Sequence, residues 1–243
     1  MTQSQWSGGR SGLVWAVVGG VILVAGVVAI ILLGLLPQSD TPATPSPTDS
    51  PTSTPAPPAN LDAAVDPAVA ERGWRPEPIT TDAETYIRAA LESASTFDTT
   101  KGTRDEWLSH LDTWFTPDTR YPEADQAARM KAAQLELRQA VVLPQQEWDS
   151  LAAEDGRVVA TTNGDVTFVP VAEDSSGGMS IGTADVTLTF TRSDGSGGEG
   201  SYDETVRVSV QVLCGAGSVP TPDTAQQAGD CKVVRWFAES LEP

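Results

Sequence analysis

An uncharged stretch near the amino end constrains this 243-residue chain more than any other feature. Residues 13–36 contain no Asp, Glu, Lys or Arg, and these 24 residues reach about 36 Å as an α-helix with a rise of about 1.5 Å per residue. That length crosses a hydrocarbon layer of roughly 30 Å. A cleaved signal peptide is the alternative, but its apolar region is shorter, about 7–15 residues. The stretch therefore predicts one transmembrane helix.

The basic residues around this helix predict its orientation. Arg10 is the only Lys or Arg before the helix, and none follows it until Arg72. Because positively charged residues favour the cytoplasmic side, residues 1–12 are expected to form a cytoplasmic tail. The rest of the chain is then expected to lie on the outer side of the cell membrane, anchored by a single pass.

A polar segment separates this helix from the remainder of the chain. Residues 37–60 consist almost entirely of Pro, Thr, Ser, Ala and Asp, a composition that cannot bury a core and favours extended conformations. We therefore expect a disordered linker over residues 37–75 and one extracytoplasmic domain over residues 76–243.

Charge and composition exclude several classes of function. The chain has 15 Lys and Arg against 33 Asp and Glu, and every acidic residue lies after the predicted helix. The net charge of −18 repels phosphate backbones, so we expect no nucleic acid partner. One His and two Cys cannot build the usual four-ligand zinc site or an iron–sulfur cluster held by four cysteines, so we expect neither a metal nor a cofactor.

The two cysteines flank a loop between two predicted strands. Cys214 ends the run VRVSVQVLC, and Cys231 begins the run CKVVRWF. An oxidising extracytoplasmic environment favours a disulfide between them, worth about 3 kcal/mol in the chain-entropy model. Two free thiols are the alternative.

Helices are predicted in the first half of the domain. Thr81 and Glu84 have the spacing of a capping box, and the apolar residues after them recur at helical spacing as far as about Thr96. A further helix is expected over residues 123–140, where apolar residues are mixed with charged ones.

A second capping box, formed by Thr103 and Glu106, opens a helix with a heavy aromatic stripe. Because the residue before a proline avoids helical geometry, this helix is expected to end before Pro117. Its apolar side chains recur at helical spacing, which predicts a core face rather than a ligand platform. The residues of the stripe are Trp107, Leu111, Trp114 and Phe115.

The hydrophobic period changes after Pro144. About five runs alternate branched or aromatic residues with polar ones, which is typical of strands that expose one face. Asn163 and Gly164 form a turn signal that predicts a hairpin between the first two runs. Helices followed by strands predict an α+β domain in which a bent antiparallel sheet wraps around the helices.

The sequence offers few groups for catalysis. His110 lies beside Ser109 and Asp112, but residues one and two apart on a helix point in different directions, so a triad is not expected. A pair of carboxylates in an apolar pocket is the remaining route, with Asp98, Asp112 and Glu106 as candidates. Their spacing does not favour catalysis over helix caps and solvated faces, and we expect no catalytic residue.

The segment at residues 197–203 resembles one turn of a calcium-binding nonapeptide repeat. Tyr202 stands where the motif needs Asp, and such motifs bind calcium only in stacked repeats. The chain also has no Gly-rich phosphate-binding motif and no GxSxG elbow. We expect this segment to be a hairpin loop.

Parts of the domain resemble a known family. The first predicted helix, the turn after it and the Trp-led second helix are similar to the opening of the TcpC-like bitopic proteins, which are encoded with conjugative elements. The final predicted strand resembles the Trp-bearing last strand of such domains. TcpC-like proteins often carry two domains, whereas only one fits here. The segments concerned are Tyr86–Leu91, Phe97–Thr100, Glu106–Leu108, Thr116–Pro117 and Val233–Phe237.

This resemblance implies a nuclear transport factor 2-like fold, as in extracytoplasmic domains of actinobacteria and other Gram-positive bacteria. It also implies a membrane-anchored scaffold of a conjugation or type IV secretion-like machine, which self-associates and docks to other envelope proteins. Two alternatives stay open. One is an accessory subunit of another envelope complex, such as the Mce-associated proteins of lipid-import systems. The other is a pocketed small-ligand binder or enzyme of the same fold.

Overall fold

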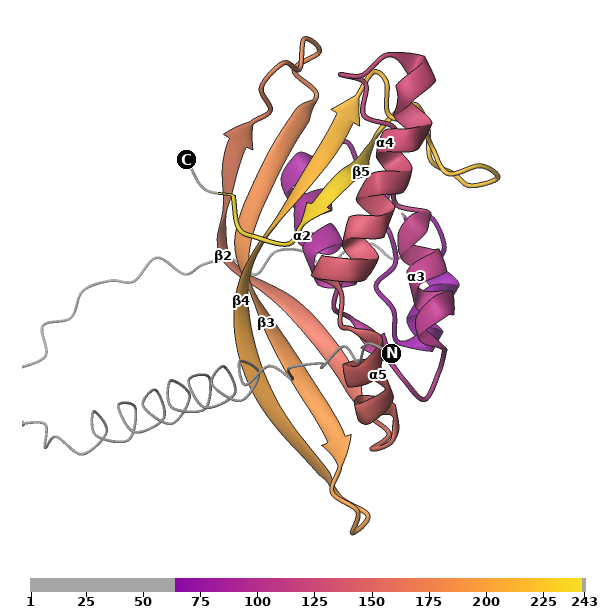
Figure 1. The fold of residues 1–243 in the computed structure, drawn as a ribbon, viewed down its shortest axis with the longest axis vertical. Coiled ribbons are helices and arrows are strands. Elements are labelled where there is room, and N and C mark those ends of the chain that lie inside the picture. Colours follow the sequence, from indigo (N-terminus) through magenta and orange to yellow (C-terminus); the bar gives the residue numbers. More distant parts are fainter. Residues whose placement is uncertain (1–63, 242–243) are drawn as a thin grey trace, which may run out of the picture. The chain divides into compact units, whose positions relative to one another are not determined.

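The computed structural model describes residues 64–241 (Figure 1), so the predicted tail, the predicted transmembrane helix and most of the predicted linker lie outside the described residues. The described residues form an α+β domain of helices and one five-stranded antiparallel sheet. Within this range, no helix combines the length and apolarity that crossing a membrane requires.

All helices of the described residues precede the long strands in the chain. The first lies in the predicted linker, where Val69 and Trp74 are buried. The folded unit therefore begins before residue 76, because these apolar side chains pack on the domain. The helices are the 3-10 helix η2 (Pro67–Arg72), α2 (Ala83–Ser93), α3 (Arg104–Asp112), α4 (Glu123–Glu136), the π-helix η3 (Leu137–Val141) and α5 (Gln145–Ala152).

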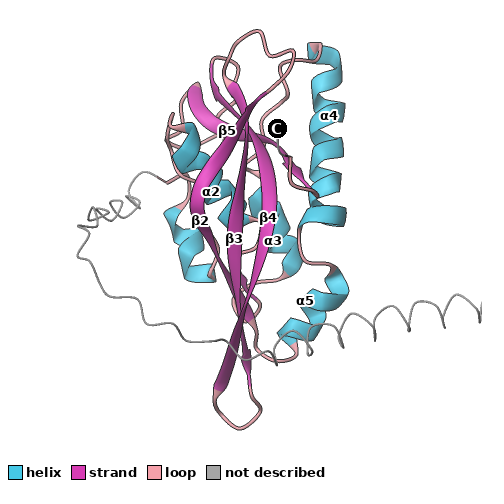
Figure 2. Cartoon of the chain, turned by 90° about the vertical axis from the view of Figure 1, so that its left-hand side faces the viewer, coloured by secondary structure: helices cyan, strands magenta, loops and turns pink. Residues whose placement is uncertain are grey.

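The sheet has the order β1-β2-β3-β4-β5, and each strand is antiparallel to its neighbours. It is curved, and the helices lie on its inner, concave side (Figure 1). Figure 2 looks onto the outer face, which no helix of the described chain covers. The strands are β1 (Phe97–Asp98), β2 (Arg157–Pro170), β3 (Met179–Ser193), β4 (Glu199–Gly215) and β5 (Gly229–Phe237).

The predicted capping box at the start of α2 is wrong. Asp82, rather than Thr81, is the N-cap, and its side chain accepts a hydrogen bond from the backbone N–H of Thr85 at 2.8 Å. Glu84 instead pairs with Arg88 one turn along the helix, at 2.7 Å. The carboxylate takes the capping position because Asp satisfies an unpaired N–H at a helix start at least as well as Thr does.

The predicted capping box of α3 is present. The N–H of Thr103 donates to Glu106 Oε2 at 2.9 Å, and the N–H of Glu106 donates to Thr103 Oγ1 at 3.3 Å. The helix ends at Asp112, well before the proline. The chain then pairs with β5, since the N–H of Thr116 donates to the carbonyl of Val233 at 2.7 Å.

The other helix ends differ from the prediction. Helix α2 ends at Ser93 rather than near Thr96, because Phe97 pairs with Val158 of β2. Helix α4 ends at Glu136, and the rest of the predicted helix adopts the wider π-helical turn of η3. Pairing and packing thus override local helix propensity at these ends.

Helix α5 was not predicted, because strands were expected after Pro144. Pro144 is its N-cap residue, and Trp148 and Leu151 are buried on one face. Two apolar residues three positions apart are too few to establish a helical period in a sequence.

The predicted hairpin at Asn163 and Gly164 is wrong, because β2 is one continuous strand. The register between β2 and β3 shifts between Asn163 and Thr167, as in a β-bulge. Gly164 has a φ of +63°, so the Asn-Gly pair supplies a bulge in place of a turn. The first two predicted strands are thus one strand, β2. The sheet still has five strands because the short strand β1 was not predicted.

All residues of the aromatic stripe lie in the core. Trp107, Leu111 and Trp114 are 0% exposed and Phe115 is 7% exposed. The ring of Phe115 meets Trp236 of β5 edge to face, with centroids 5.0 Å apart. The stripe therefore packs α3 and the turn after it against the sheet.

A second aromatic cluster joins β1, α3 and α5. The ring of Phe97 stacks on Trp148 with centroids 4.3 Å apart and lies 4.9 Å from Trp107. Trp107 and Trp148 also stack at 5.6 Å. These contacts are the reason that the unpredicted helix α5 packs where it does.

The predicted disulfide is confirmed. Cys214 near the end of β4 is bonded to Cys231 in β5, and the bond closes the loop between these two strands. Because disulfides persist in oxidising compartments, the bond indicates an extracytoplasmic location for the domain.

Replacing Trp107 with Ala is expected to lower the free energy of unfolding by about 3–5 kcal/mol, because a fully buried indole is lost beside Phe97. Urea denaturation of both proteins measures the difference. Leu135→Ala is the control, since Leu135 is 52% exposed and its truncation should change stability by less than about 0.5 kcal/mol. A similar small loss for Trp107→Ala would contradict a core position.

Reduction of the Cys214–Cys231 bond is expected to lower the melting temperature. The bond joins cysteines 17 positions apart. Opening a loop of this size restores conformational entropy to the unfolded chain and lowers the free energy of unfolding by about 3 kcal/mol. Thermal unfolding followed by circular dichroism, with and without reductant, measures the shift. Alkylation of both cysteines in the unreduced native protein would be the contrary result.

Candidate binding groove

The inner groove is a pair of adjoining clefts between the sheet and the helices. Their volumes are about 420 and 250 Å³, and they share Ser95, Val141 and Leu188 in their walls. Both are open to solvent on one side. The remaining wall residues are mostly aliphatic or aromatic and include Leu91 and Ala94 of α2, Val186 and Phe190 of β3, and Val206 and Val208 of β4.

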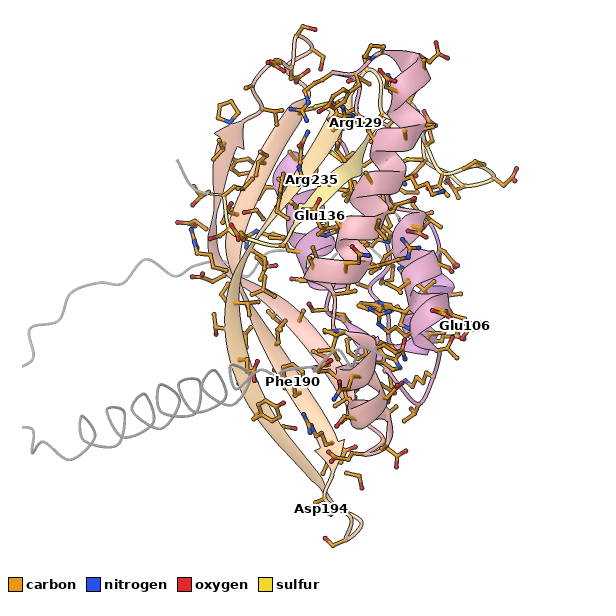
Figure 3. The ribbon with its side chains drawn as sticks, in the orientation of Figure 1. Glu106, Arg129, Glu136, Phe190, Asp194 and Arg235 are labelled. Carbon is orange, nitrogen blue, oxygen red and sulfur yellow. A yellow bond between two sulfur atoms is a disulfide. The ribbon has the colours of Figure 1, made fainter. Side chains whose placement is uncertain are left out.

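Strand alternation places these side chains on the inner face. Along β3, Val186, Leu188 and Phe190 face the helices, and Figure 3 shows Phe190 on that side of the sheet. The intervening residues Thr187 and Thr189 face outward and bond to hydroxyl or carboxylate groups of β4. Within the described chain, no Asp, Glu, His or Cys lines either cleft.

The groove ends beside a length of β4 that has a strand on one side only. Strand β5 pairs with β4 from Ser209 onward. Residues 199–206 pair with β3 and, within the described chain, with no second strand. Glu199, Asp203 and Glu204 place charges along this edge, which discourages unspecific edge-to-edge pairing.

An arginine-rich cleft of about 240 Å³ lies between α4 and the strands β4 and β5. Arg235 forms two bonds with Glu136, at 2.6 and 2.9 Å (Figure 3). Arg120 is similarly paired with a neighbouring Asp, and Arg129 lies over the ring of Tyr121 at 4.5 Å. Because two of these three guanidinium groups are neutralised, the cleft has little excess positive charge for an anion.

The three candidate carboxylates are not brought together. Asp98 accepts hydrogen bonds from the N–H and Oγ1 of Thr100, at 2.9 and 2.6 Å, in the turn after β1. Asp112 pairs with Arg138 of η3. Glu106 caps α3, on the side of that helix away from the sheet (Figure 3). None of them lines the inner groove, so the structure assembles no carboxylate pair there.

The groups near His110 are bonded elsewhere. His110 Nε2 donates to the carbonyl of Arg75 at 3.0 Å, and its ring stacks on Trp74 at 5.5 Å. The hydroxyl of Ser109 donates to the carbonyl of Asp105 at 2.8 Å. Burial lowers the pKa of His110, which favours the neutral ring.

The segment at residues 197–203 completes the β3–β4 hairpin loop and enters β4. Asp194 at the tip of this hairpin (Figure 3) accepts a hydrogen bond from the N–H of Gly198 at 2.9 Å. Glu199 forms two bonds with Arg157, each at 2.7 Å. Among the residues that the structure describes, no group of three His, Cys, Asp or Glu is placed to hold a metal ion.

A buried charge cluster, formed by Glu77, Lys232, Tyr86 and Gln226, joins the start of the domain to β5. Lys232 Nζ lies 2.8 Å from Glu77 Oε1, and both side chains are 1% exposed. The same oxygen accepts from Tyr86 OH at 2.5 Å and from Gln226 Nε2 at 3.1 Å. Glu77 Oε2 is buried without a hydrogen-bond partner.

The ammonium of Lys232 has further partners. It donates to the carbonyl of Thr113 at 2.6 Å and to Thr221 Oγ1 at 2.8 Å. Burial raises the pKa of Glu77 and lowers the pKa of Lys232. The cluster was missed in the sequence, because Glu77 lies between prolines and a Lys in a strand is typically exposed.

No protein-family model matches the sequence, and no curated protein or solved structure matches the chain. The function must therefore be inferred from the groups that the domain itself brings together. The inner groove is an apolar surface that the described domain leaves open, and the buried charge cluster gathers ionisable groups away from solvent.

Acidification is expected to destabilise the domain through His110, the only histidine in the chain. Burial lowers the folded pKa below the ordinary value of 6.5, so the unfolded state binds a proton first as the pH falls. The contribution of His110 is therefore complete above pH 6.5 and is lost as the pH falls toward the lower folded pKa. Urea unfolding at pH values between about 5 and 8 measures the slope.

His110→Gln is the comparison for this slope, because Gln keeps a donor for the carbonyl of Arg75 and does not titrate. The variant should lose most of the rise in unfolding free energy with pH in this window. If the unfolding free energy of the variant changes with pH as steeply as that of the native chain, groups other than His110 cause the pH dependence.

Proposed function

We propose that this chain is a membrane-anchored extracytoplasmic scaffold subunit, and that its domain binds partner proteins through the inner groove. The observation that carries the proposal is the position of the groove. Its aliphatic wall reaches Val206, beside the length of β4 that lacks a second neighbouring strand in the described chain. The disulfide supports an extracytoplasmic domain, and residues 13–36 supply the proposed anchor.

The proposed binding mode is strand addition. Strand β5 ends at Phe237, opposite Ser209, so an extended partner segment beside residues 199–206 would continue the place of β5 in the sheet. Because side chains alternate across a strand, every second residue of the partner would point toward the groove. Backbone hydrogen bonds would supply affinity, and the aliphatic walls would select apolar side chains.

The kind of machine is proposed from the resemblance to TcpC-like proteins. Helices followed by a curved antiparallel sheet are compatible with the nuclear transport factor 2-like fold that this resemblance implies. The partners would then be envelope subunits of a conjugation or type IV secretion-like machine, together with further copies of the chain. We assign the domain no enzymatic turnover. A Mce-associated role would use the same anchor and domain.

A small apolar ligand is the second candidate for the groove. The larger cleft, of about 420 Å³, has the volume and the apolar lining of many ligand sites, which measure about 300–1,000 Å³. This candidate predicts that the groove takes up a lipid or a similar molecule.

Val206→Glu is expected to reduce partner binding at least about tenfold, because burying its charge against an apolar partner costs more than about 1.4 kcal/mol. Val206 is half-buried, so the unbound domain can leave the new carboxylate in solvent. A photoreactive amino acid at Leu188 of the full-length membrane-anchored chain measures contact, since Leu188 lies in both clefts. Mass spectrometry identifies the adduct.

Thr205→Glu is the matched control, since it adds the same charge one residue away, on the outer face. Protein adducts should persist in this variant, and their loss in both variants or in neither would contradict the groove. Adducts with lipid alone would contradict strand addition and support the second candidate. A partner encoded beside relaxase and coupling-ATPase genes would support the secretion-like machine, and a lipid-permease subunit would support the Mce-associated role.

A further inference from the structure

The buried charge cluster has the groups needed for a covalent bond between two distant parts of the chain. We propose that Lys232 Nζ and the carboxyl group of Glu77 condense to an isopeptide bond, with loss of one water molecule. The two groups are 2.8 Å apart and each side chain is 1% exposed, so bulk water has little access to either charge. Holding two reactants in contact in a dry site replaces the need for a high concentration of either.

The surroundings favour the neutral forms that this reaction uses. Burial raises the pKa of Glu77 and lowers that of Lys232. One proton transferred from Nζ to the carboxylate converts the ion pair into an amine and a carboxylic acid. The amine then has a free lone pair, and the acid has a hydroxyl that can leave as water.

The bond changes can be written for named atoms. The lone pair of Lys232 Nζ forms a bond to Glu77 Cδ, and the electrons of the carbonyl double bond move onto Oε1. Tyr86 OH and Gln226 Nε2 already donate to Oε1, at 2.5 and 3.1 Å, as the donors of an oxyanion hole do. The hydroxyl at Oε2 takes a second proton from Nζ, and the electrons on Oε1 re-form the carbonyl double bond as the bond from Cδ to Oε2 breaks and water leaves. Atoms and charges balance without an oxidant or a second substrate.

The product satisfies the site better than the ion pair does. Glu77 Oε2 is buried without a hydrogen-bond partner, and it is the atom that leaves. Oε1 keeps the donors Tyr86 and Gln226, and the new amide N–H faces the carbonyl of Thr113 and Thr221 Oγ1, at 2.6 and 2.8 Å from Nζ. Two charges without access to water become one hydrogen-bonded neutral amide, which removes their desolvation cost.

The bond would fasten the N-terminal arm, residues 64–82, to β5. Near its start the arm folds back on itself through a β-bridge between Ala64 and Pro78, and near its end the carbonyl of Thr80 accepts a hydrogen bond from the N–H of Cys231 in β5, at 2.8 Å. Lys232 follows Cys231, so adjacent residues of β5 would carry a disulfide and an isopeptide bond. The arm follows the polar segment of residues 37–60 in the sequence, so the bond would resist pulling on that segment.

Peptide mapping of the full-length chain, purified in detergent, reduced and denatured, tests the proposal. Trypsin does not cleave before Pro76 and cannot cleave at a modified lysine, so residues 73–88 should be joined to residues 208–235. The joined peptide should weigh one water molecule less than its two parts. Lys101 and Asp98, whose ion pair is 3.6 Å long and whose lysine side chain is 50% exposed, are the internal control and should appear without loss of water.

Cleavage after Lys232, with residues 73–88 recovered at full mass, would overturn the proposal. Residues 208–235 recovered alone, uncleaved after Lys232 and lighter by one ammonia, would also overturn it, because the bond would then lie on the Gln226 amide. Tyr86→Phe tests the chemistry without removing either reactant. Joining after refolding should be about a hundredfold slower in this variant, the usual effect of one oxyanion donor, and an unchanged rate would overturn the assigned role of Tyr86.

Discussion

Covering the inner face of one long, curved sheet is the constraint on which the rest of the structure depends. Strand β4 has 17 residues and spans about 56 Å, whereas the 11 residues of α2 span about 16 Å. One helix therefore cannot cover the strands it crosses. The aromatic cluster of Phe97, Trp107 and Trp148 brings α3 and α5 over part of the remainder. The inner groove is the apolar length that these helices leave open.

Part of the outer face carries polar side chains and has no covering helix (Figure 2). Asn163 Nδ2 donates to Thr187 Oγ1 across neighbouring strands at 2.6 Å, and Thr189 donates to Asp203 at 2.7 Å. Cross-strand pairs of this kind stabilise a sheet through polar groups alone. The two faces of the same strands therefore differ in what they can bind, and an apolar partner is expected on the concave side.

Local signals in the sequence predicted those parts of the fold that depend on near neighbours. The capping box of Thr103 and the disulfide are examples, since each follows from spacing and environment. The Asn163-Gly164 signal wrongly implied a turn, because pairing with β3 decides whether a residue with a positive φ, such as Gly164, serves a hairpin or a bulge. The inner groove and the Glu77–Lys232 pair form between segments that are distant in the sequence. A local sequence pattern does not predict such contacts.

The buried charge cluster and the inner groove also belong to one line of contacts through the molecule. The arm meets β5 at the Glu77–Lys232 pair, β5 pairs with β4 from Ser209 onward, and the open length of β4 continues directly from that pairing. A buried ion pair adds little net stability, but breaking one by separating its partners is costly. A buried ion pair is therefore more useful where two segments must keep their positions than where the fold only needs added stability. Strand β5 forms such a junction between segments, because it contacts the arm at Lys232 and pairs with β4 from Ser209 onward.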